Sequence, residues 1–293
     1  MSRFLSIVTV VSASLASLVG CGGSPERDVD TGDTSALDAA LVGDSSESAT
    51  ASAQGSGLAA PLFLGLDSRT LWNGSTATDA AGPLLAARAA IEDRYHPMGC
   101  AKLEADGIDR ARLTLKDCAT PGGFAHLTGV LAIVLSGEPG NVRVDLSAPT
   151  GLVAGDRSIE FAASVDIVTT DGTQTITWKT TTWRATTARG TAFSHTTDVT
   201  ITLDLASMCT VTSGSTMGHA ETTDAAGGVE TRGLSTVIDG FAVCPGKCPT
   251  NGTLRSTGER THRTVVLRFD GSSSVHVTGV HGRTFDLPLA CGA

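Results

Sequence analysis

The sequence predicts a mainly β protein whose body is an antiparallel sandwich or open barrel, braced by disulfides, with one short N-terminal helix. Apolar and polar residues alternate in several stretches after residue 110, and Asp-Gly or His-Gly dipeptides, which favour hairpin turns, separate some of them. The chain also contains forty threonines, many of them in these stretches. Threonine favours extended backbone and suits a sheet with one face in water. We therefore expect antiparallel sheets that are buried on one face.

One helix is expected over residues 83–95. Pro83 suits a first helical turn, and Pro97 with Gly99 would terminate the helix. Apolar residues recur between them at helical spacing, at Leu84, Ala87, Ile91 and Tyr95.

Strands are expected wherever the apolar period changes to two. The predicted ranges are 112–116, 127–135, 142–146, 159–168, 173–187, 196–205, 264–269, 274–280 and 283–289. Trp178 and Trp183 are five residues apart, so a regular strand would place one in the core and the other at the rim. The glycosylation-like triplets Asn73-Gly74-Ser75 and Asn251-Gly252-Thr253 are predicted to be turns.

The first twenty residues are typical of a secretory signal peptide. Arg3 supplies a positive start, and an apolar, small-residue stretch follows that is too short for a permanent spanning helix. The stretch ends in Leu18-Val19-Gly20-Cys21, which resembles the lipobox of bacterial lipoproteins at all four positions. The resemblance implies cleavage before Cys21, lipid on its sulfur and an acyl group on its new amine, which together anchor a chain firmly. The alternative is an ordinary signal peptide followed by a chance cysteine.

Gly22 follows the lipobox cysteine where an aspartate would act as a retention signal. In bacterial lipoproteins this pattern implies transfer to the outer membrane. The resemblance therefore predicts a lipid-anchored protein of the cell envelope, with the membrane as its partner through Cys21.

Residues 22–57 are predicted to be a disordered acidic tether between the lipid and the body. They contain seven carboxylates and one arginine, a net charge of −6, with few apolar residues and no aromatic ones. Such a segment buries too little apolar surface to offset its chain entropy. As a flexible coil it would reach about 30–35 Å. Asp28, Asp30 and Asp33 resemble calcium ligands only superficially, because the glycine and closing glutamate of an EF-hand are missing.

Residues 58–293 are predicted to form one β-rich globular domain. They carry 19 basic and 23 acidic residues, a net charge of −4, and no clustered basic patch. This balance argues against a nucleic-acid partner. No apolar run in this range reaches the length that spans a membrane.

Six cysteines remain in the body after Cys21: Cys100, Cys118, Cys209, Cys244, Cys248 and Cys291. An even number in an exported chain predicts disulfides. One assignment pairs Cys100 with Cys118, Cys209 with Cys244, and Cys248 with Cys291. Its rival keeps the first pair but joins Cys244 to Cys248 and Cys209 to Cys291. A redox motif at Cys244 to Cys248 is disfavoured, because three residues separate the cysteines instead of two.

No catalytic motif, metal site or cofactor site emerges from the sequence. The nucleophile elbow, the paired-histidine zinc motif and the phosphate loop are all missing. A hydrolase triad of Ser213 or Ser215 with His219 and Asp224 is one alternative. His262 and His276 facing each other across a hairpin would be another, as half of a metal site.

The layout as a whole runs from lipobox to acidic tether to a cysteine-bracketed β body that ends in Leu-Pro-Leu-Ala-Cys. It resembles the threonine-rich β lipoproteins of myxobacteria-like species, a group that implies no activity. The favoured hypothesis is a non-enzymatic envelope lipoprotein that presents its β domain for binding or structural contact. The alternatives are an exported hydrolase acting on envelope or prey polymers and a periplasmic carrier of an apolar ligand.

Overall fold

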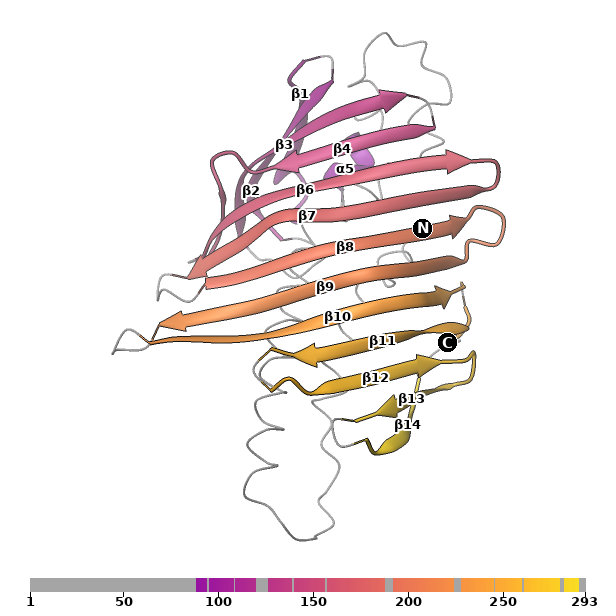
Figure 1. The fold of residues 1–293 in the computed structure, drawn as a ribbon. Coiled ribbons are helices and arrows are strands. Elements are labelled where there is room, and N and C mark those ends of the chain that lie inside the picture. Colours follow the sequence, from indigo (N-terminus) through magenta and orange to yellow (C-terminus); the bar gives the residue numbers. More distant parts are fainter. Residues whose placement is uncertain are drawn as a thin grey trace.

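A computed structural model describes residues 88–289 of the chain, except residues 94, 108, 120–125, 139, 156, 188–191, 224–227, 245, 260 and 280–281. The described part contains one short helix, α5 (Arg88–Glu92), and fourteen strands (Figure 1). The first seven strands are β1 (Ala101–Ala105), β2 (Arg110–Cys118), β3 (Leu127–Glu138), β4 (Asn141–Ser147), β5 (Leu152–Ala154), β6 (Arg157–Thr170) and β7 (Thr173–Thr187). The others are β8 (Ala192–Asp204), β9 (Thr210–Thr223), β10 (Val229–Val243), β11 (Asn251–Gly258), β12 (Thr264–Phe269), β13 (Ser274–Thr278) and β14 (Thr284–Pro288).

All fourteen strands belong to one antiparallel sheet. Thirteen of them follow the chain order from β1 to β14, and β5 pairs with β3 and β6 beside β4. Figure 1 shows this meander as a broad, twisted sheet in which consecutive strands lie side by side. The prediction of a mainly β, antiparallel, disulfide-braced fold is confirmed.

The strand predictions are right where apolar residues alternate and incomplete elsewhere. The ranges predicted between residues 112 and 205 lie within β2 to β8, except that the last one runs one residue past Asp204. Nothing in the sequence had predicted five of the strands, namely β1, β5, β9, β10 and β11. The turn predicted at Asn251-Gly252-Thr253 is wrong, because these residues begin β11. Gly252 is needed there because a Cβ atom would collide with the backbone of Phe241.

The helix α5 covers only part of the predicted range. Residues 83–87 lie outside the described residues, and the helix ends at Glu92. The Glu92 carboxylate accepts hydrogen bonds from the Leu103 backbone N–H at 2.7 Å and from Arg88 Nε at 2.8 Å. These contacts attach α5 to β1, and Ile91 and Tyr95 are fully buried in the core.

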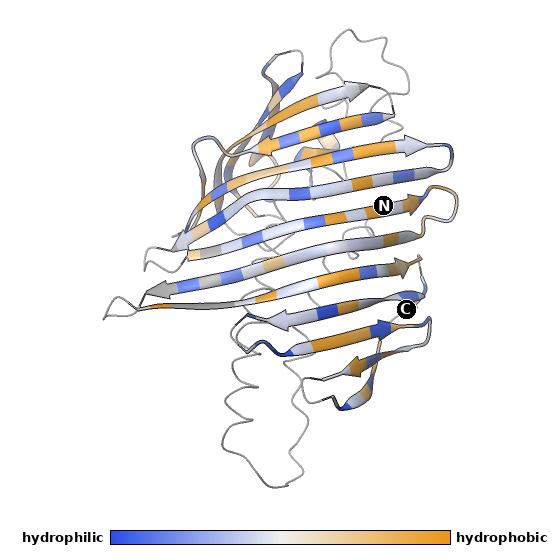
Figure 2. Ribbon diagram, viewed as in Figure 1, coloured by the Kyte–Doolittle hydropathy of each residue, from blue (hydrophilic) through white to orange (hydrophobic). Residues whose placement is uncertain are grey.

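The two faces of the sheet differ in burial. On the inner face, side chains such as Leu113, Val144, Val165 and Trp178 are almost completely buried, and along β4 buried residues alternate with exposed or half-buried ones. We call the opposite, solvent-exposed side the outer face. Apolar residues are conspicuous in β3, β4, β6 and β12, whereas β7 and β9 are paler along much of their length (Figure 2). β9 contributes no side chain to the buried hydrophobic residues of the described chain, whereas β7 buries the indoles of Trp178 and Trp183.

A β-bulge at Thr181 changes the face of the sheet to which the following side chains of β7 point. Ala162 pairs with Thr182 and Ala163 with Thr180, so Thr181 is an extra residue, and its hydroxyl donates to the Ala162 carbonyl at 3.1 Å. The prediction that Trp178 and Trp183 lie on opposite faces is wrong: both are buried on the inner face, 5% and 2% exposed. The extra residue shifts the alternation by one position between them.

Two disulfides are present among the described residues, Cys100–Cys118 and Cys209–Cys244. They confirm two pairs of the favoured assignment and exclude the rival, which needed Cys244 for Cys248. Cys248 is also disulfide-bonded. Cys291 lies outside the described residues, so the Cys248–Cys291 pair stays a prediction.

The predicted signal peptide (1–20), Cys21, the tether (22–57) and the triplet Asn73-Gly74-Ser75 lie outside the described residues as well. In the part of the chain that is described, no helix has the length and apolar character needed to cross a membrane.

Candidate functional site

A line of hydroxyl groups crosses the inner face of the sheet in its middle. The pairing register brings Thr180 of β7, Thr197 of β8 and Thr216 of β9 side by side. It then continues to Thr236 of β10 and Ser256 of β11. We call these five residues the hydroxyl row. Four of its members are at least nine-tenths buried, and Thr216 is half-buried.

Most of the hydroxyl row is hydrogen-bonded within the sheet. The Thr236 and Ser256 hydroxyls lie 2.9 Å apart, and Thr197 Oγ1 lies 2.6 Å from Nε2 of His195. Thr180 Oγ1 is different, because it is buried and has no hydrogen-bond partner. The indole N–H of Trp183, on the same strand and the same face, is also buried without a partner. Each such group costs free energy of folding until something satisfies it.

His195 is the buried titratable group of this region. Its side chain is 2% exposed and its ring stands edge-on to Trp183, with centroids 6.4 Å apart. Desolvation by burial lowers the pKa of His195 from 6.5 to about 4, although a backbone hydrogen bond with Met217 opposes the shift. His195 is therefore neutral at pH 7, with one ring nitrogen bonded to the Met217 backbone and Nε2 facing the Thr197 hydroxyl.

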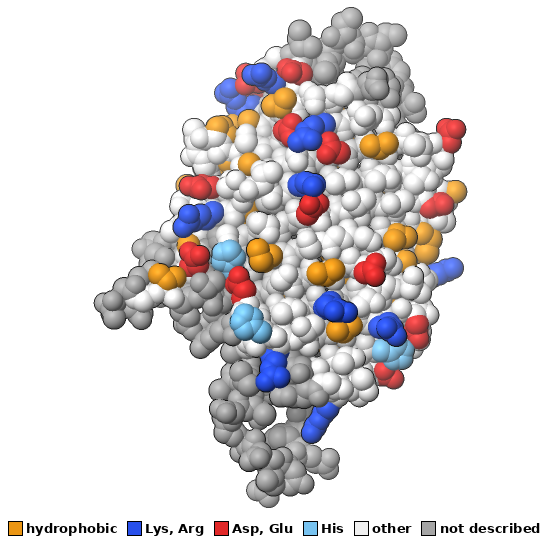
Figure 3. Space-filling model, viewed as in Figure 1, with side chains coloured by type: hydrophobic (Ala, Val, Ile, Leu, Met, Phe, Trp, Pro, Cys, Tyr) orange, Lys and Arg blue, Asp and Glu red, His pale blue; other side chains and the backbone are white. Residues whose placement is uncertain are grey.

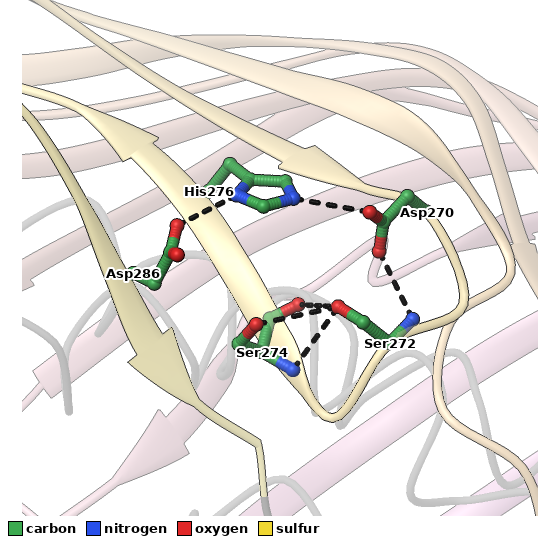
Figure 4. A network of polar contacts seen from close by, with 5 residues as sticks. All are labelled: Asp270, Ser272, Ser274, His276 and Asp286. Atoms are coloured by element: carbon green, nitrogen blue, oxygen red, sulfur yellow. Dashed lines mark hydrogen bonds and ion pairs between the residues drawn. The ribbon is translucent and has the colours of Figure 1, made fainter.

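A second polar cluster lies on the outer face near the end of the sheet (Figure 4). His276 of β13 stands between two carboxylates, with Nδ1 2.6 Å from Asp286 Oδ1 and Nε2 3.0 Å from Asp270 Oδ2. Hydrogen bonds to Asp270 and then Asp286 raise the pKa of His276. The side chain and then the backbone N–H of Ser272, followed by His276, hold the pKa of Asp270 well below its ordinary value.

This cluster ties strands together and leaves no free catalytic base. Both imidazole nitrogens face carboxylates, so the protonated ring donates to Asp270 and Asp286 at once. Figure 4 shows Ser272 and Ser274 bonded to each other and not to the ring. The register places Arg268 and Asp286 opposite His276, so the predicted approach of His262 to His276 is wrong.

A third cluster joins β8 to β9 on the outer face. Ser194 Oγ lies 2.7 Å from Nε2 of His219, and Glu221 Oε1 approaches the same nitrogen at 3.8 Å. In a hydrolase triad the carboxylate must hold Nδ1 so that Nε2 is free for the serine. Ser194, His219 and Glu221 are therefore not arranged as a catalytic triad, because the serine and the carboxylate approach the same ring nitrogen.

The predicted serine partners of His219 are engaged or distant. Ser213 Oγ accepts a hydrogen bond from the Gly240 N–H at 3.0 Å. Ser215 lies on the same strand as His219, four residues away, and pairs with Asp198 and Val237. Asp224 is outside the described residues. Within the described ranges, no three His, Cys, Asp or Glu side chains converge in a way that could hold a metal ion.

Sequence reasoning did not find the hydroxyl row, His195 or Ser194. In the predicted strand 196–205, the apolar residues Val199, Ile201, Leu203 and Leu205 all occupy odd-numbered positions. Extending that odd-numbered face back along β8 would have placed Thr197 and His195 in the core. The rest of the row depends on pairings between strands that the sequence did not predict.

The chain matches no protein-family model, no curated protein and no solved structure.

The burial of His195 predicts a loss of stability in mild acid. Below pH 6.5 the unfolded chain binds a proton at this residue, but the folded chain does not until about pH 4. The free energy of unfolding should therefore fall as the pH is lowered from 6.5 to 4, by about 3 kcal/mol at most. Urea unfolding at several pH values measures it. In His195→Gln the loss should shrink by that amount, while the exposed control His262→Gln should behave as wild type. An unchanged acid dependence in His195→Gln would contradict the burial argument.

The two flanking carboxylates predict a raised pKa for the imidazole of His276. Because its folded pKa is raised, its contribution to stability is complete below about pH 6.5 and is lost as the pH rises through the folded pKa. We expect NMR titration of the ring protons to place this pKa above 6.5, the ordinary value for a histidine. Asp286→Asn and Asp270→Asn should each lower it, because each removes one negative partner. Equal pKa values in wild type and both variants would show that the cluster does not form in solution.

Proposed function

We propose that the protein is a lipid-anchored component of the cell envelope that presents its β domain for binding or structural contact, without catalysis. The anchor is the lipid on Cys21, residues 22–57 are the tether, and the outer membrane is the proposed location. The observation that carries the proposal is the broad outer face of the sheet. Figure 3 shows this face, where uncharged polar groups dominate and charged side chains are scattered.

Several charges on the outer face are paired with one another. Lys179 Nζ lies 2.9 Å from Asp198 Oδ2 across β7 and β8. Arg143 of β4 contacts Asp145 and Asp166 at 3.1 and 3.3 Å. Exposed pairs of this kind stabilise the fold little, but they neutralise charge on this part of the outer face. We therefore propose a protein or uncharged polymer as the partner, and no nucleic acid.

The sheet is a suitable platform for presentation because it is braced. Cys100–Cys118 joins the first two strands, and Cys209–Cys244 joins the β8–β9 turn to the end of β10. The strands form one sheet in which β1 and β14 each pair with a single neighbour, so we favour an open barrel over a sandwich.

The hydrolase alternative has less support, because Ser194 and Glu221 approach the same nitrogen of His219. The carrier alternative draws on the inner face, where Thr180 Oγ1 and the Trp183 indole N–H are buried without a hydrogen-bond partner.

The anchor predicts how the protein distributes in cells. Wild-type chain should sediment with membranes and incorporate labelled palmitate, whereas Cys21→Ser should do neither, because acyl chains supply the membrane affinity. A matched control is Cys248→Ser, which removes another cysteine but should keep both properties. If Cys21→Ser sediments as wild type does and neither is labelled, the proposed anchor is wrong.

A further inference from the structure

We propose that the outer face, where β9 ends, binds the guanidinium group of an arginine side chain on a protein partner, between the carboxylates of Glu221 and Glu259. This site rests on the proposed function, because it gives the chemistry of a partner that the outer face would bind. Two observations carry it. One carboxylate oxygen is buried without a hydrogen-bond partner, and two glutamates flank one histidine with no lysine or arginine of the described chain paired to them.

The pairing register places four residues in one row on the outer face at this end of the sheet. Ser194 of β8 pairs with His219 of β9, and His219 pairs with Gly233 of β10. The backbone N–H of Glu259, just after β11, donates to the Gly233 carbonyl at 2.9 Å and adds Glu259 to the row. Glu221 follows His219 by two residues along β9, so it points to the same face. Figure 3 shows histidine and acidic side chains next to one another in this part of the outer face.

Gly233 leaves the space that the Glu259 carboxylate occupies. A Cβ atom on Gly233 would lie 2.5 Å from Glu259 Oε2 and 2.6 Å from the Cβ atom of His219. The carboxylate and the histidine side chain are therefore close neighbours, with no β10 side chain between them. Gly233 has no left-handed backbone, so the close approach of Glu259 and His219 is what requires glycine at this position.

Glu259 Oε2 is the atom that lacks a partner. It is buried and accepts no hydrogen bond, although Glu259 as a whole is only half-buried. His219 does not satisfy it, because Nε2 of the ring faces Ser194 Oγ at 2.7 Å. A buried carboxylate oxygen without a donor is costly in free energy, so an N–H donor from a partner would relieve that cost.

Glu221 is the second acceptor of the site. Its Oε1 atom lies 3.8 Å from Nε2 of His219, which is beyond hydrogen-bond distance. Among the residues that the structure describes, no lysine or arginine forms an ion pair with Glu221 or Glu259, including Arg184 two strands away in β7. Elsewhere on this face, by contrast, Asp198 is paired with a lysine. The end of β9 therefore offers two carboxylates to a cation from outside.

The separation of the two acceptors favours a guanidinium over a metal ion or an ammonium group. Glu259 lies beside the Cβ atom of His219 and Glu221 approaches the far end of the ring, so the histidine side chain lies between the two carboxylates. Within the described chain, no three such side chains converge as a metal ion requires. A guanidinium distributes five N–H donors over a planar group and can bond two separated carboxylates, whereas an ammonium is a compact point charge.

The test uses three small probes that differ only in their side chain. The full chain, with isotope-labelled histidine, is titrated with N-acetylargininamide, with its uncharged analogue N-acetylcitrullinamide and with N-acetyllysinamide, and the ring signals of His219 are followed by NMR. We expect the arginine probe to bind about tenfold more tightly than the other two, because it alone combines charge with a planar set of donors. No response to the arginine probe, or equal affinity for it and either of the others, would overturn the proposal.

Two variants each remove one negative charge with little change of shape: Glu221→Gln and Glu259→Gln. Each should weaken binding of the arginine probe by about tenfold, the worth of one hydrogen bond to a charged group. The matched control is Glu160→Gln, an exposed glutamate on the outer face of β6, which should bind as wild type does. Equal binding by Glu259→Gln and Glu160→Gln would overturn the proposal.

Urea unfolding without any probe gives a second readout for the same variants. If Glu259 Oε2 has no partner in the folded chain, Glu259→Gln should unfold at a higher urea concentration than wild type, because a buried charge without a donor is removed. A lower midpoint would mean that the carboxylate is already satisfied, which also overturns the proposal. Neither result bears on the anchor, which Cys21→Ser and palmitate labelling test separately.

Discussion

The register of one continuous backbone ladder is the constraint on which the other features depend. Each strand from β6 to β13 pairs with its neighbours without interruption except at local bulges, so a residue in one strand fixes which residues lie beside it in the next. A slip of one residue would exchange the two faces of a strand. The hydroxyl row exists only because the register of several strands holds together.

That constraint gives the sheet two faces of different chemistry. The outer face carries threonines, serines and paired charges and meets water. The inner face is apolar toward the first strands and hydroxyl-bearing in the middle, where His195 and Trp183 are buried. The bulge at Thr181 adjusts β7 to both faces. It brings the indole of Trp183 into the core, while the Thr181 hydroxyl donates a hydrogen bond to β6. The outer and inner faces are therefore two separate surfaces of one scaffold.

The sequence predicted the fold where hydrophobicity alternates and missed it where it does not. β4 and β6 place valine, leucine, isoleucine or phenylalanine at nearly every inward position, and the period of two is visible. β9 buries Thr210, Thr212 and Gly218 instead, so its inward and outward residues have nearly the same hydropathy. β11 alternates glycine, leucine and serine, and its first residues resemble a turn. The His276 cluster could not be predicted from the sequence either, because its two carboxylates come from a turn and from the neighbouring strand.

Cysteine scanning along β9 tests this account most directly, since the hydropathy of that strand is nearly uniform. Single cysteines at Val211, Ser215 and Met217, which are exposed, and at Thr212 and Thr216, which point inward, would be treated with a maleimide under native conditions. We predict rapid modification at the three outward positions and slow modification at the two inward ones, with equal rates after unfolding. Equal rates at all five positions in the native protein would mean that β9 has no buried face, and the two-faced sheet would be refuted.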